Sequence, residues 1–274
     1  MQRNTKAIAV PFDGAYRVAV ELPDSCANKV PWQSVVAATC VKCLQDDVTV
    51  RYVLADYVPT QRFGGFDSVK AVTIGINPAP NKPRRRALPL LSDFGRSSRS
   101  DLQTDDLISI SELQTTYFDD GTGHTFFDNN FFFVLDTIDK SWTYQSGRVA
   151  HIDVVFCVTS PLWAELGKTD ETAQSAIRQN CRPNFLESLQ MVPPATWLLW
   201  GGSETMKALE ELKPVVEASG KTKEKQVAWK MGQIELRGHS YPFMAWDKVV
   251  MSNSDRCEIG ELVKARILCA AASR

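Results

Sequence analysis

The chain has almost no net charge, few histidines and no long apolar run. Its 274 residues include 31 Lys and Arg against 32 Asp and Glu, a formal net charge of −1. Any nucleic-acid contact must therefore come from a local basic patch. No stretch approaches the roughly 18 apolar residues of a membrane span, and the apolar run after residue 6 is too short for a signal peptide. We expect a cytoplasmic protein without a membrane partner.

Three common enzyme signatures are also missing. The chain has no Gly-x-Ser-x-Gly elbow, no complete Gly-x-x-x-x-Gly-Lys-Ser/Thr loop and no Gly-x-Gly-x-x-Gly fingerprint. Their absence disfavours an unrelated α/β hydrolase or nucleotide-binding enzyme. The seven cysteines are an odd number scattered over a long chain, which suits a reducing compartment better than a disulfide framework.

Hydrophobic periodicity predicts strands that alternate with helices. The expected strands cover residues 15–22, 48–58, 68–74, 151–158, 196–200, 226–237 and 248–251; the expected helices cover 31–44, 131–142, 172–191, 203–218 and 258–272. Residues 79–130 form a long polar stretch that we expect to be mostly loop. The alternation predicts one α/β domain over residues 1–274, a three-layer α/β/α sandwich with a mostly parallel central sheet.

Three segments with unusual chemistry follow or end these strands: Gly75-Ile76-Asn77-Pro78, Asp153, and Ser252-Asn253-Ser254. Ligands of such sheets bind beyond the carboxyl ends of the strands, so the three segments predict an active site. Taken alone, Gly-Ile-Asn-Pro could be a simple turn. A buried Asp153 needs a partner, and either His151, on the same side of its strand, or an arginine could supply one.

The order and spacing of these segments resemble the uracil-DNA glycosylase superfamily. The segment 75–78 resembles the first active-site motif of the mismatch-specific and single-strand-selective branches, and the segments 151–157, 181–186 and 193–201 resemble the iron–sulfur branch. The resemblance covers about residues 66–265 and leaves 1–65 as an N-terminal extension packed on that core. It implies an atypical, monofunctional DNA-repair hydrolase, a monomer that removes uracil from DNA and leaves an abasic site.

The first motif and the following loop supply most of the implied substrate contacts. Asn77 would orient the attacking water, because an amide cannot act as a general base. Gly75, Ile76 and Pro78 would line the uracil site, with the Ile76 N–H on the uracil O2. Phe94 would stack on the base, with Tyr117 or Phe118 as alternatives.

Asp153 departs from the pattern, because the superfamily usually places Asn there. An amide donates to the uracil O4 and accepts from N3–H, whereas an ionised carboxylate can only accept. This departure and the poor second motif favour an alternative function, a weak or inactive relative that binds uracil-containing or abasic DNA.

The second motif has two candidates, neither with the full His-Pro-Ser or Asn-Pro-Ser pattern. One is Ser252-Asn253-Ser254, where Asn253 would assist catalysis while Ser252 and Ser254 bind substrate. The other is Gly238-His239-Ser240, with His239 as the electrophile. Basic side chains would hold the DNA backbone, and Arg96 and Arg99 are further members of this patch. The main candidates are Lys82, Arg84, Arg85, Arg86 and Arg256.

Four cysteines occupy the positions that hold a four-iron cluster in the iron–sulfur branch: Cys40, Cys43, Cys157 and Cys181. Their separations are longer than the branch pattern, and Cys40 and Cys43 also fit the buried face of a helix. The primary expectation is therefore no metal and no cofactor, with a 4Fe–4S cluster as the alternative.

Overall fold

The computed structural model describes residues 40–60, 62–77, 88–119, 125–248 and 250–272, with the backbone alone for 125–129. The expected strand at 15–22 and most of the expected helix at 31–44 lie outside the described residues. So do Pro78 and the four basic residues Lys82, Arg84, Arg85 and Arg86. Within the described ranges, no helix has the length and apolar character needed to cross a bilayer.

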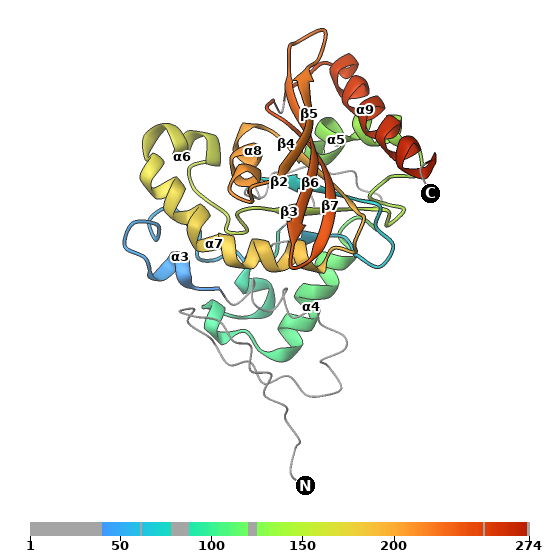
Figure 1. Ribbon diagram of the computed structural model, residues 1–274. Coiled ribbons are helices and arrows are strands. Elements are labelled where there is room, and N and C mark those ends of the chain that lie inside the picture. The colour runs from blue at the N-terminus through green and yellow to red at the C-terminus, as the bar shows by residue number, and fades with distance from the viewer. Residues whose placement is uncertain (1–39, 61, 78–87, 120–124, 249, 273–274) are drawn as a thin grey trace.

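A seven-stranded mixed sheet occupies the centre of the protein (Figure 1). Its strands are β1 (Arg62–Phe63), β2 (Ala71–Gly75), β3 (Val149–Asp153), β4 (Trp197–Gly201), β5 (Val215–Lys221), β6 (Ala228–Leu236) and β7 (His239–Trp246). They lie in the order β1-β3-β2-β4-β7-β6-β5. The four central strands β3, β2, β4 and β7 are parallel, whereas β1, β6 and β5 pair antiparallel with their neighbours.

Helices flank this sheet (Figure 1). They are α3 (Lys42–Gln45), α4 (Thr104–Thr115), α5 (Thr125–Ile138), α6 (Trp163–Thr169), α7 (Glu171–Met191), α8 (Ser203–Glu210) and α9 (Asn253–Ala272), with the 3-10 turns η1 (Leu91–Phe94) and η2 (Arg99–Asp101). Successive strand residues point to opposite faces. Val72 and Ile74 join the apolar cluster that includes α6, α7 and α8. Ala71 and Leu199 join the cluster that includes α5 and α9.

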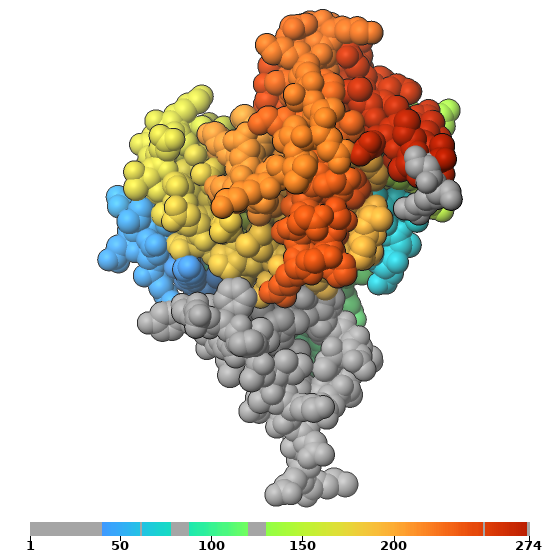
Figure 2. All heavy atoms as spheres, in the orientation of Figure 1, coloured from blue at the N-terminus to red at the C-terminus, as the bar shows by residue number. Residues whose placement is uncertain are grey.

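Helix α9 packs closely on α5 and on the β5–β6 hairpin. A Cβ at Gly260 of α9 would lie 2.8 Å from the Val134 carbonyl oxygen of α5, so only glycine allows this approach. The carboxylates of Glu258 and Asp255 accept hydrogen bonds from the backbone N–H groups of Lys223 (3.0 Å) and Lys225 (3.2 Å) in the hairpin. Figure 2 shows the hairpin and α9 side by side at one end of the molecule.

The structure corrects four of the expected elements. Residues 48–58 form turns with two isolated bridges, not a strand, and 79–130 contains α4 and both 3-10 turns. The expected helix at 203–218 ends at Glu210, because Lys213 has a positive φ of 52° and the chain then enters β5. The expected strand at 248–251 is wrong, since residues 248, 250 and 251 are not in a strand and β7 is the last strand of the described residues. The sheet was expected to be mostly parallel, and parallel pairing is found among its four central strands only.

Candidate functional site

The parallel strands place a topological switch point at the carboxyl ends of β2 and β4. The chain goes from β2 to β3 on one side and then crosses to β4 on the other. Crevices at such points are the usual ligand sites of α/β sheets. Asn77 lies two residues beyond β2, and Asp153 ends β3 in register with Gly75. The structure therefore brings these three predicted residues to one edge of the sheet.

A buried polar network leads to this edge on the α5 side of the sheet. Tyr144 Oη and Thr73 Oγ1 are 2.8 Å apart, and Thr73 Oγ1 is 2.8 Å from His151 Nδ1. His151 Nε2 lies 3.2 Å from Asp153 Oδ1. His151 and Asp153 are 0% and 3% exposed, so each must be satisfied inside the protein. Of the two partners expected for Asp153, His151 or an arginine, the structure shows His151.

Gly75 allows this network to approach β2. A Cβ at this position would lie 2.4 Å from Asp153 Oδ1 and 2.7 Å from His151 Nε2. Any side chain would therefore displace both groups. The glycine of the first motif has a packing role here, whatever chemistry follows it.

The Asn77 side chain is half-buried and held in one orientation. Its Nδ2 donates to Thr159 Oγ1 at 3.1 Å. The Gly75 and Ile76 carbonyls accept from the backbone N–H groups of Val154 (3.0 Å) and Val155 (2.8 Å). These bonds fix the turn and the amide. In the described part of the chain, Asn77 Oδ1 has no hydrogen-bond partner, so it can accept from a water or a ligand.

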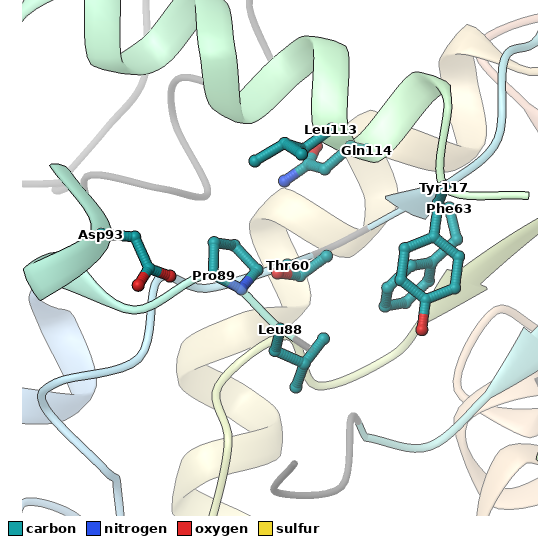
Figure 3. Close-up of a pocket in the computed structure, with 8 residues that line it drawn as sticks. All are labelled: Thr60, Phe63, Leu88, Pro89, Asp93, Leu113, Gln114 and Tyr117. Atoms are coloured by element: carbon teal, nitrogen blue, oxygen red, sulfur yellow. The ribbon is translucent and has the colours of Figure 1, made fainter. Parts of the chain in front are cut away.

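The aromatic candidates lie in different places. Phe94 packs on the apolar cluster of η1 and α4, and it does not line the pocket beside α4 that Phe63 and Tyr117 line (Figure 3). Phe118 is buried and stacks on Tyr144, with 4.5 Å between ring centroids. Tyr117 lies beside Phe63, whose ring centroid is 5.9 Å from that of His151. Phe118 therefore contacts the polar network directly through Tyr144, whereas Tyr117 is connected to it through Phe63.

The two candidates for the second motif lie in different surroundings. Ser252 Oγ lies 2.7 Å from Asp255 Oδ2 and accepts from the Asp255 N–H at 3.1 Å, so it caps α9. Asn253 Oδ1 accepts from Arg256 Nη1 at 3.0 Å, and Ser254 is exposed. His239 is exposed at the start of β7, the edge opposite the carboxyl ends. The structure does not bring His239 to Asn77.

The described arginines of the predicted DNA-binding set are engaged within the protein. Arg96 Nε binds Asp106 Oδ2 at 2.7 Å, and Arg256 holds Asn253. Arg99 is 2% exposed, and its guanidinium donates to the carbonyls of Cys40 (2.9 Å) and Leu54 (3.2 Å). The prediction that Arg99 contacts a DNA phosphate is therefore wrong, because its side chain is buried.

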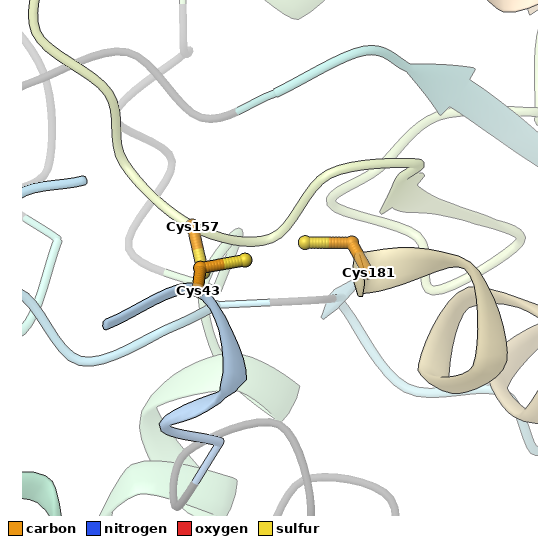
Figure 4. A group of neighbouring side chains, drawn as sticks. All are labelled: Cys43, Cys157 and Cys181. Carbon is orange, nitrogen blue, oxygen red and sulfur yellow. The ribbon is translucent and has the colours of Figure 1, made fainter. Parts of the chain in front are cut away.

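Arg99 contacts a cysteine cluster in the apolar cluster that includes α7. Figure 4 shows its three buried members, Cys43, Cys157 and Cys181. The sulfur atoms of Cys43 from α3, Cys157 after β3 and Cys181 from α7 lie within 4.8 Å of one another, and all three residues are buried. Cys40 is half-buried and packs on the same apolar cluster. Arg99 Nη1 is 4.0 Å from Cys157 Sγ.

The charge distribution in this cluster favours one thiolate. The neighbouring Cys181 and Cys43 thiols donate to Cys157 and lower its pKa well below the usual value, with a further contribution from the Arg99 cation. Burial raises the pKa of Cys181 and of Cys40. The three buried sulfur donors, of which Cys157 is favoured as the thiolate, form a soft ligand set that suits zinc or an iron–sulfur cluster.

Sequence reasoning missed Thr73, Tyr144 and Phe63, which support His151. Thr73 precedes Gly75 by two residues on β2, so the period of two already predicts that it shares a face with that residue. Tyr144 and Phe63 come from a turn and a two-residue strand, which carry no such signal. No protein-family model, curated protein or solved structure matches this chain.

Proposed function

We propose that this protein is a DNA glycosylase that hydrolyses the N-glycosidic bond of uracil in DNA, as an atypical member of the uracil-DNA glycosylase superfamily. The observation that carries the proposal is the position of Asn77, which donates to Thr159 at the switch point of the sheet and lies two residues beyond Gly75, the register partner of Asp153. The proposal includes the finer fold assignment, a three-layer α/β/α sandwich around the parallel strands.

In this proposal Asn77 orients the attacking water. Its Nδ2 is engaged by Thr159, which leaves Oδ1 to accept a hydrogen from water and turn an oxygen lone pair toward the sugar carbon. The amide takes up no proton near neutral pH. Catalysis then depends chiefly on an oxocarbenium-like sugar and on stabilisation of the departing uracil anion.

The N–H of Ile76 would stabilise that anion at O2, and Asp153 would accept the uracil N3–H while it remains paired with His151. An ionised carboxylate offers no donor to O4. A second polar group must therefore donate a hydrogen bond to the uracil O4. The aromatic pair Phe63 and Tyr117 lies on the same side of the sheet as His151.

Cys43, Cys157 and Cys181 fit ligands of a four-iron cluster by donor type, burial and the proximity of Arg99, and the half-buried Cys40 would be the fourth ligand. A cluster bound there would join α3 to α7 and to the segment after β3. Its contribution would be structural. It would lie on the α7 core, whereas His151 and Asp153 face the α5 core.

A catalytically weak relative that binds uracil-containing or abasic DNA is the second candidate. The observation in its favour is the segment 252–254, whose Ser252 caps α9 and whose Asn253 holds Arg256. Ser252 and Asn253 thus form hydrogen bonds within the protein and not with a substrate.

Incubation with a uracil-containing oligonucleotide, followed by alkali, tests the proposal. We expect strand cleavage at uracil, none at thymine, and little with Asn77→Ala. Tight binding of the uracil strand without cleavage would favour the second candidate. If the wild type cleaved the strand no more than Asn77→Ala does, the glycosylase proposal would be ruled out.

A further inference from the structure

The turn between β5 and β6 carries a group of exposed lysines, and Figure 1 shows this turn at the top of the molecule, beside α9. Lys221, Lys223 and Lys225 alternate along the turn. Lys248, shortly after β7, lies beside them, because its Nζ donates to the Lys225 carbonyl at 2.8 Å. All four side chains are exposed, and they are termed the hairpin lysines. In a chain with a net charge of only −1, they concentrate positive charge in one place.

Three carboxylates near this turn accept hydrogen bonds from its backbone rather than from its lysine side chains. The pairs are Lys223 N–H to Glu258 Oε2 (3.0 Å), Lys225 N–H to Asp255 Oδ1 (3.2 Å) and Ala228 N–H to Asp247 Oδ1 (3.0 Å). In the described part of the chain, the three lysines of the turn form no ion pair. Glu224 adds one exposed carboxylate between them. The ammonium groups are therefore available to an anion from outside the protein.

The backbone of the turn is held in one shape. The Thr222 N–H donates to the Val227 carbonyl at 3.0 Å, and the Val227 N–H donates to Thr222 Oγ1 at 3.0 Å. Gln226 Nε2 donates to the Thr222 carbonyl, also at 3.0 Å. A preorganised surface loses less conformational entropy when it binds, so a partner of the hairpin lysines need not order this turn.

The strand register places the turn at the same edge of the sheet as Asn77. Strands β2, β4 and β7 are parallel, and β5 runs in the same direction, because two antiparallel pairings separate it from β7. One row of register partners crosses the sheet through Ile74, Trp200, Ala245, Lys230 and Ser219. Asn77 lies three residues beyond one end of this row, and Lys221 lies two beyond the other. From β2 to β5 the row crosses four strand spacings, about 19 Å in total.

We propose that the hairpin lysines bind a nucleic-acid backbone that runs along this edge of the sheet from Asn77. In each strand of a duplex the phosphates follow one another about every 3.4 Å along the axis, so about 19 Å corresponds to roughly five or six nucleotides. Lysine binds phosphate as a point charge and reads no base. The contact is therefore independent of sequence. The position of the reacting nucleotide at Asn77 rests on the proposed function, whereas the backbone contact does not.

Fluorescence anisotropy of an undamaged, labelled DNA duplex with the full-length protein tests this contact over a series of salt concentrations. The double variant Lys223→Gln/Lys225→Gln removes two charges and keeps the backbone N–H groups that bind Glu258 and Asp255. We expect its affinity at low salt to fall by about 5-fold or more, and the slope of log Kd against log salt concentration to decrease by about 2.

The matched control is Lys70→Gln/Lys213→Gln. It removes the same charge from two exposed lysines that lie shortly before β2 and β5, at the opposite edge of the sheet. This control should keep the wild-type salt slope. Both double variants should melt with the wild type, because exposed substitutions of this kind change stability little.

An unchanged salt slope in the hairpin variant, or an equal decrease in the control, would overturn the assignment. Loss of binding to phosphatidylserine vesicles with unchanged DNA binding would also overturn it and assign the lysines to a membrane surface instead.

The outcomes separate this proposal from the glycosylase. A reduced salt slope in the hairpin variant of a protein that excises no uracil would support the surface and reject the enzyme. If the enzyme is active, the hairpin variant should raise KM for a uracil-containing duplex and leave kcat unchanged. Excision with the wild-type KM and an unchanged salt slope would support the enzyme and reject the surface.

Discussion

Gly75 is a residue whose identity depends directly on its neighbours. Its Cα faces two buried polar side chains, and a methyl group would collide with both. Asn77, two residues later, has a fixed amide and an open carbonyl oxygen. The first motif thus combines a glycine required by packing with an amide available for a ligand.

Gly75→Ala should destabilise the fold by about 1–3 kcal/mol, the usual range for overpacking, because Asp153 and His151 must move. Gly65→Ala is the matched control, since its Cβ would lie 3.5 Å from Thr115 Cγ2, an ordinary contact. Urea unfolding of both variants measures the difference. Equal stability of the two would contradict the account of the Gly75 contact.

At the scale of elements, the start of α9 depends on a buried carboxylate. Asp255 is 0% exposed. Burial opposes its ionisation, but hydrogen bonds from Thr222, Ser252 and the Lys225 N–H lower its pKa from 3.8 to about 2. These contacts join α9 to the β5–β6 hairpin.

Because the folded pKa is depressed, the contribution of Asp255 is present above about pH 4 and is lost as the pH falls toward 2. The shift corresponds to about 2 kcal/mol. Asp255→Asn should therefore be less stable than the wild type at neutral pH, with the gap closing below pH 4. Thermal melts across this range measure it. The exposed Glu261→Gln on the same helix should stay within about 0.5 kcal/mol of the wild type, and a constant gap for Asp255→Asn would contradict the linkage.

The sequence predicted the elements with strong periodicity and failed where tertiary pairing decides. β2, α7 and β4 are found within one or two residues of their expected ends, apart from the start of β2, because apolar runs bounded by Gly or Pro define them. The first part of β5, residues 215–218, was expected as helix, since only pairing with β6 makes this segment a strand. The His151–Asp153 contact was predictable from the strand period. The contacts of Arg99 were not predictable, because its partners Cys40 and Leu54 come from a distant segment of the chain.

At the scale of the whole molecule, the cysteine cluster connects three regions far apart in the sequence. Cys43 comes from α3, Cys157 from the segment after β3 and Cys181 from α7. The described part of the N-terminal extension also supplies β1 to the sheet. Residues 40–65 are therefore integral to the core.

Protein purified without oxygen should contain iron and acid-labile sulfide, and Cys157→Ser should lose both. Loss of the link should lower the melting temperature by about 5–10 °C, equivalent to a few kcal/mol for a chain of this size. Metal analysis and calorimetry measure the two effects, with Cys269→Ser on the exposed part of α9 as control. Zinc without sulfide would replace the iron–sulfur assignment by a zinc site, and a metal-free protein of unchanged stability would reject both.

The central claim is that Asn77 orients the water that releases uracil. Single-turnover excision from a uracil-containing strand tests it, with the melting temperature measured alongside. The account predicts that Asn77→Ala slows excision about 10²- to 10³-fold while the melting temperature changes little, because its side chain makes one hydrogen bond to the fold. An unchanged rate in Asn77→Ala, or no excision by the wild type, would contradict it.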